Sequence, residues 1–90
     1  MRRIELPCFF ENEETETLGT IGKPYPLSQC SVKNISFIDI AYIEPYIDEE
    51  EQKEYTLIGS NGGDVICAIP YRETCKRIDK HQAMQFLTNT

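Results

Sequence analysis

Five residues of this chain have side chains that readily do covalent or metal chemistry: Cys8, Cys30, Cys67, Cys75 and His81. Zinc ligands usually include pairs two to four residues apart, and the cysteines show no such spacing. A nucleophilic Cys–His pair would need Cys75 beside His81, but six positions turn these residues to different faces of one helix. We therefore expect buried or half-buried free thiols and an exposed histidine, with no catalytic residue, metal or cofactor. A disulfide, or a small enzyme or metal site on Cys67, Cys75 and His81, stays open as an alternative.

The glycine-rich segment 59–63, Gly-Ser-Asn-Gly-Gly, is a second candidate for chemistry. A phosphate-binding loop is followed by a helix whose N-terminus faces the anion. Here the β-branched residues from 65 onward predict a strand, and no Lys-Ser or Lys-Thr pair follows the glycines. Asn-Gly is typical of tight hairpin turns, because both residues tolerate positive φ. The segment is therefore predicted to be a hairpin turn.

Composition limits the function classes. With 90 residues, the chain is expected to form a single domain over 1–90. A net charge of −6 and a pI of about 4.7 argue against a general nucleic-acid binder. No run approaches the length of a membrane helix, and no apolar stretch follows the basic N-terminus as in a signal peptide. We expect a cytoplasmic protein without a membrane partner.

The charges are unevenly distributed along the chain. Residues 11–54 hold eleven acidic and three basic residues, a net charge of −8, whereas residues 71–90 have a net charge of +2. Acidic loops keep a small β protein soluble, and they also offer a face to a basic partner. A basic helix in the last segment would bind nucleic acid weakly and in a salt-sensitive way. The residues that we expect to interact are Arg72, Lys76, Arg77, Lys80, Tyr46, Glu49, Glu50 and Glu51.

The first elements that would position these side chains follow from periodicity and turn residues. Residues 2–10 are predicted to form a strand, because apolar and polar residues alternate over 3–6 and an apolar run continues over 8–10. Pro7 indicates that this strand lies at an edge or bends, because proline cannot donate to a sheet. Closely spaced glycines and prolines predict that residues 11–29 form a loop excursion with at most a short strand.

The middle of the chain holds its densest apolar run, over 30–47. Its β-branched and aromatic residues favour a strand, and the apolar side chains at both parities indicate a strand covered on both sides. Asn34 and Asp39 are candidates for a turn or bulge that splits the run. The charged segment 48–54 is predicted to be a solvated loop before another strand at 55–58.

The last third predicts a hairpin followed by a helix. Residues 65–69 are expected to pair with 55–58, and Pro70 suits the start of a helix. Apolar residues spaced four and three apart predict a C-terminal helical segment over 71–87. The predicted class is mainly β (α+β): a small antiparallel sheet, or an SH3-like partly open barrel, with one C-terminal helix.

Residues 38–79 follow an order of elements that resembles a known family. The order is strand, acidic loop, strand, Asn-Gly, strand and charged helix, and it is similar to the small flagellar FlbD-like proteins and other short bacterial proteins. The matching segments are Ile40-Ala41-Tyr42-Ile43-Glu44-Pro45, Tyr55-Thr56-Leu57-Ile58, Asn61-Gly62-Gly63, 65–69 and 71–78. The resemblance covers about half of the chain, and it implies a small non-enzymatic accessory or regulatory protein.

The expected function is therefore a small binding or accessory module that acts through protein contacts, with self-association into a homo-oligomer as one form. The alternative is a regulator linked to nucleic acid. It would use the basic helix directly, or it would act as an acidic mimic that blocks a basic DNA-binding protein.

Overall fold

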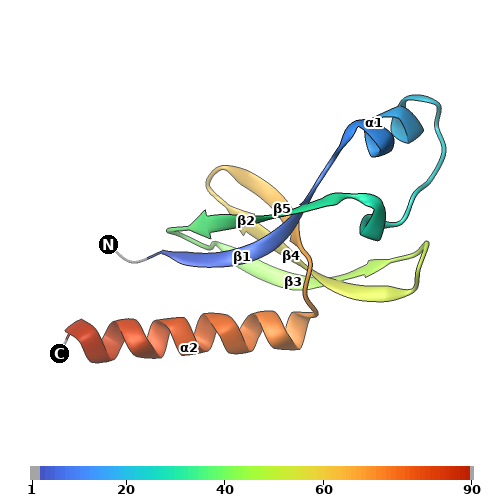
Figure 1. Cartoon of the computed structure of the whole chain (residues 1–90). Helices are drawn as coiled ribbons and strands as arrows, with labels where there is room; N and C mark the ends of the chain where they lie inside the picture. The colour runs from blue at the N-terminus through green and yellow to red at the C-terminus, as the bar shows by residue number, and fades with distance from the viewer. Residues whose placement is uncertain (1–2, 90) are drawn as a thin grey trace.

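The computed structural model describes the backbone of residues 3–89 and the side chains of residues 3–82. Five antiparallel strands form one open sheet in the order β2-β1-β5-β4-β3, and a C-terminal helix runs beneath it (Figure 1). The predicted fold class is confirmed. In chain order the elements are β1 Ile4–Phe10, α1 Glu13–Thr20, the 3-10 helix η1 Leu27–Gln29, β2 Ser31–Phe37, β3 Tyr42–Asp48, β4 Lys53–Ser60, β5 Gly63–Cys67 and α2 Tyr71–Asn89.

β1 lies at the centre of the sheet, between β2 and β5. The expectation that Pro7 marks an edge strand is therefore wrong. Pro7 lies opposite Asn34 of β2, and its carbonyl accepts a hydrogen bond of 2.7 Å from the amide of Ala68. Because proline has no N–H, it cannot return that bond. Pro7 thus weakens the pairing of β1 with β5 rather than ending the sheet.

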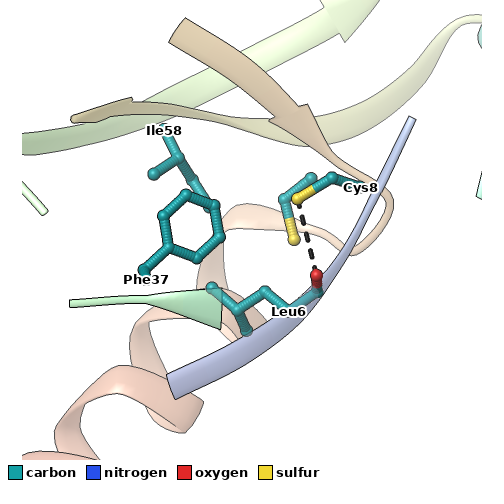
Figure 2. Close-up of a cluster of buried hydrophobic side chains, with 5 residues drawn as sticks. Leu6, Cys8, Phe37 and Ile58 are labelled. Atoms are coloured by element: carbon teal, nitrogen blue, oxygen red, sulfur yellow. Dashed lines mark hydrogen bonds between the residues drawn. The ribbon is translucent and has the colours of Figure 1, made fainter. Parts of the chain in front are cut away.

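The buried core lies between the sheet and α2. Leu6 and Cys8 of β1 gather with Phe37 and Ile58 in a cluster in which every side chain is at most 6% exposed (Figure 2). These residues occupy alternate positions of their strands, as expected when one face of a sheet is covered. Thr74 of α2 is also fully buried. The face of the sheet that α2 covers is therefore the better packed one.

The segment 11–29 differs from its prediction, because it contains an α-helix and not only a loop. Asn12 caps α1: its side-chain oxygen accepts from the amide of Thr15 (2.9 Å), and the Thr15 hydroxyl accepts from the amide of Asn12 (2.8 Å). The glutamates of the first turn are favoured there by the helix dipole. No apolar periodicity predicts α1, because its sequence contains no apolar stripe.

The apolar run 30–47 forms two strands, β2 and β3, separated at 38–41. The break falls at Asp39 rather than Asn34, which lies inside β2. The expectation of a strand covered on both sides is wrong. Ile38, in the connection after β2, is 58% exposed, and Tyr42, at the start of the edge strand β3, is 46% exposed.

The charged segment 48–54 is a turn of four residues, 49–52, rather than a longer loop. Gln52 takes a left-handed conformation there, with φ of 55°. Asp48 ends β3 and is only 5% exposed, so it is not a solvated acid. Its two carboxylate oxygens accept from the amides of Leu27 (3.0 Å) and Glu50 (3.2 Å).

The hairpin of β4 and β5 is confirmed, with Ser60 opposite Gly63. Its positive φ, however, lies at Gly63 (118°), whereas neither Asn61 nor Gly62 has one. The turn is therefore not the mirror-image type that the Asn-Gly pair predicts.

The C-terminal helix α2 begins directly after Pro70, as predicted, and its backbone continues to Asn89. The predicted segment 71–87 therefore belongs to one helix. The side chains of residues 83–89 lie outside the described part of the chain. Within that part, no helix is both long and apolar enough to cross a membrane.

Candidate functional site

Two of the four cysteines face each other at the centre of the fold. Cys8 of β1 lies directly opposite Cys67 of β5, and both side chains are fully buried. The bond from the amide of Ala68 to the carbonyl of Pro7 flanks this pair, which makes it a pair without hydrogen bonds of its own. In such pairs the Cα atoms lie about 4.5 Å apart and the side chains approach each other closely. All four cysteines are free thiols.

The two buried thiols differ in acidity because they interact. A hydrogen bond from Cys8 lowers the pKa of Cys67 to about 7, against the opposing effect of burial, and Ile69 and Thr74 contribute further hydrogen bonds. The same contact with Cys67, together with burial, raises the pKa of Cys8. Cys67 is therefore the thiol of the pair that ionises first.

Cys75 and His81, the other candidates for chemistry, both lie on α2. Cys75 lies on α2, where its hydrogen bond with Tyr71 is the main cause that raises the pKa of that phenol. His81 is half-buried rather than exposed, and it lines a cavity of about 170 Å³ with Ile4 and Ile78. Among the residues whose side chains are described, no three His, Cys, Asp or Glu groups are close enough to hold a metal ion.

The basic residues of α2 differ in their position on the helix and in their ion pairing. Arg72, Lys76 and Lys80 are exposed and four positions apart, so they form one stripe along the helix. Arg77 lies outside this stripe, and its Nε is 3.4 Å from Oε1 of Glu73. We call Arg72, Lys76 and Lys80 the basic stripe.

Glu49 and Glu50 line a groove together with Tyr46. The groove of about 440 Å³ lies where the end of β3 meets the segment before η1. Glu51 lies beside it and accepts a hydrogen bond from the hydroxyl of Ser28. We call this groove the acidic groove. It is lined by Pro24, Tyr25, Tyr46, Ile47, Asp48, Glu49 and Glu50.

Buried Asp48 holds the two walls of the acidic groove together. It belongs to β3, and it accepts from the amide of Leu27, which lies two residues after Tyr25 of the other wall. The hydroxyl of Tyr25 donates to Glu11 (3.3 Å), which ties this wall to the end of β1.

The structure brings Tyr46, Glu49 and Glu50 together in one groove and adds partners that the sequence did not indicate. Pro24 and Tyr25 come from a distant segment, and their only signal is a Pro-Tyr-Pro run of restricted backbone. Arg72 and the other basic residues lie on α2, away from the groove lining.

The strand beside the groove is an open edge. In the described part of the chain β3 pairs with β4 alone, so its other side offers free backbone donors and acceptors. Tyr46 is 38% exposed and Ile47 is 52% exposed on this strand.

Comparisons with protein-family models, curated proteins and solved structures gave no match to this chain. The resemblance of residues 38–79 to FlbD-like proteins stays a prediction.

Proposed function

We propose that this chain is a small, non-enzymatic binding module of the cytoplasm that acts through protein contacts at the acidic groove and the open edge of β3. The exposure of Tyr46 and Ile47 on an edge strand beside three glutamates carries the proposal. Tyrosine and clustered apolar side chains are typical of interaction sites. The free thiols fit a reducing compartment.

The chemistry of the groove favours a basic, extended protein segment as the partner. Glu49, Glu50 and Glu51 are all exposed, so cationic side chains can approach them without displacing an internal ion pair. An extended segment can also form backbone hydrogen bonds with the free edge of β3, as in strand addition. A second copy of the chain is the other occupant that the charges allow, because its basic stripe complements the groove.

The test is the binding of a synthetic peptide with alternating lysine and valine residues, followed by fluorescence anisotropy. We expect binding that weakens with salt and falls about tenfold or more in the Glu49→Lys/Glu50→Lys variant. The matched control is Glu13→Lys/Glu14→Lys, which makes the same change of net charge on exposed residues of α1. It should change the affinity about twofold or less.

Light scattering over a range of concentrations tests the second copy as occupant. A concentration-dependent dimer that Glu49→Lys/Glu50→Lys dissociates would identify the chain itself as the partner. Equal losses in the two variants would show that only net charge matters. If the wild-type chain stays monomeric and binds no peptide, the proposal is wrong.

The basic stripe favours a second candidate function, the binding of nucleic acid. Its three cations lie along one side of α2 and are exposed. With three phosphate contacts, log K should fall with log salt at a slope of about −2.7 on duplex DNA. In fluorescence polarisation at low salt, Lys76→Glu/Lys80→Glu should abolish binding, whereas Lys23→Glu/Lys53→Glu should weaken it only slightly. Binding insensitive to both changes would exclude this role.

A further inference from the structure

The pairing of β1 with β5, which we call the β1–β5 joint, is the shortest strand pairing in the described sheet. In the described part of the chain, the register between these strands consists of Cys8 opposite Cys67, whereas β1 matches β2 over seven pairs. Pro7 limits this joint, because it accepts from Ala68 and cannot donate in return. The joint nevertheless connects the β1–β2 ribbon to the three strands β3, β4 and β5.

The two residues of this joint have the geometry of a disulfide-forming pair. A Cα separation of about 4.5 Å, expected for directly opposed residues without mutual hydrogen bonds, lies within the range that disulfides span. Both side chains point to the same face of the sheet, because opposed residues share a face, and both are fully buried there. The thiol of Cys8 is a weak donor, and its sulfur lies 3.5 Å from the carbonyl oxygen of Leu6 (Figure 2).

We propose that Cys8 and Cys67 form a reversible intramolecular disulfide when the protein meets a hydroperoxide, and that this bond locks the β1–β5 joint. The inference is independent of the acidic groove. It assigns a redox modification site to residues that otherwise only fill the core.

The reaction balances with hydrogen peroxide as the oxidant. The Cys67 thiolate attacks one peroxide oxygen, the O–O bond breaks, and the product is a sulfenic acid with release of hydroxide, which takes up the proton of Cys67 to form water. The Cys8 sulfur then attacks the sulfenic sulfur, its proton leaves with the hydroxyl group, and a second water forms. Each sulfur is oxidised by one electron, and the peroxide is reduced by two.

The roles of the two thiols follow from their surroundings. Cys67 is ionised more readily, since its pKa is lowered to about 7, so it is the attacking thiolate. Cys8, whose pKa is raised, is the resolving thiol. Full burial excludes large reagents, so oxidation requires a water-sized oxidant and a local opening of the short joint.

The experiment uses the Cys30→Ala/Cys75→Ala variant, which removes the two half-buried thiols and leaves the pair untouched. The folded variant is treated with hydrogen peroxide, quenched, unfolded, alkylated and weighed by mass spectrometry. We expect the loss of two hydrogen atoms, no alkylation, and a peptide that links Cys8 to Cys67. A rise in Tm of about 10–20 °C should accompany the bond and reverse with dithiothreitol.

The same variant with Cys67→Ala added is the control, and it should show neither the mass change nor the rise in Tm. Two alkylated thiols after treatment would overturn the proposal. Sulfinic acid at either residue, or a disulfide between two chains, would overturn it as well. These outcomes are read from the chain with its native pair, so they do not depend on whether a substitution of Cys8 folds.

Discussion

The attachment of α2 to the sheet depends on two buried threonines. The hydroxyls of Thr56 in β4 and Thr74 in α2 are 2.8 Å apart, and both residues are fully buried. Thr56 donates its one hydroxyl proton to the carbonyl of Ile69 (2.9 Å), so its oxygen accepts the proton of Thr74, whose hydroxyl also lies 3.1 Å from the carbonyl of Pro70. No described buried side-chain polar atom lacks a partner, so removal of either hydroxyl should be measurable.

The magnitudes follow from the bonds that each substitution leaves unmade. Thr74→Val removes the shared bond and leaves Thr56 with Ile69 as acceptor, so we expect a loss of about 1 kcal/mol. Thr56→Val should lose about 2 kcal/mol, because it also leaves the carbonyl of Ile69 without this donor. The double variant should lose about 1 kcal/mol less than the sum, since the shared bond is then counted once.

Urea unfolding followed by circular dichroism measures these losses, and thermal unfolding supports them. For a chain of this length, 1 kcal/mol corresponds to a shift in Tm of about 5 °C. The control is Thr17→Val, whose exposed hydroxyl donates to the carbonyl of Glu13 within α1, and it should change stability by about 0.5 kcal/mol or less. The reasoning is refuted if Thr74→Val is as stable as the wild type, or if the losses at Thr56 and Thr74 add fully.

Three further predictions concern single positions. Gly59→Ala should destabilise the fold by about 1–3 kcal/mol in urea unfolding, because a Cβ there would overlap the ring of Tyr42; the loss should shrink in a Tyr42→Ala background. Asn12→Ala should destabilise by about 1–2 kcal/mol and speed amide exchange in α1, because it removes the cap. Burial raises the pKa of Tyr55 above 10, so the unfolded chain ionises first and stability should fall as pH rises past about 10. Tyr55→Phe should flatten that fall in urea midpoints measured across this range, and an unchanged slope would contradict the cause.

Local sequence patterns predicted several elements of the fold. The alternation over β1, the turn at 60–64 and the helix after Pro70 are set by neighbours in sequence, and all three are present. α1 could not be predicted in the same way, because its cap is a reciprocal pair of side chains and it lacks an apolar face. The central position of β1 depends on pairing with the distant β5, which no local pattern encodes.

The candidate sites also combine residues that are close in sequence with residues that only tertiary contacts bring together. Tyr46, Glu49 and Glu50 are close in sequence, and they line the same wall of the groove. The other wall of the groove is placed by the bond between Asp48 and Leu27, which is a tertiary contact. The pairing of Cys8 with Cys67 is a matter of register between strands from opposite ends of the chain, and the spacing of the cysteines gives no hint of it.

The strand order also bears on how the chain folds as it is synthesised. The hairpins that link β3, β4 and β5 have short turns, so these strands can pair as soon as they emerge. β1 is made first, but its place between β2 and β5 closes only after residue 67 is available. Until then its apolar residues have no complete core to enter, and closing so long a loop carries an entropic cost. We therefore expect β3, β4 and β5 to pair first. The ribbon of β1 and β2 is synthesised earlier, but we expect it to dock onto these strands last.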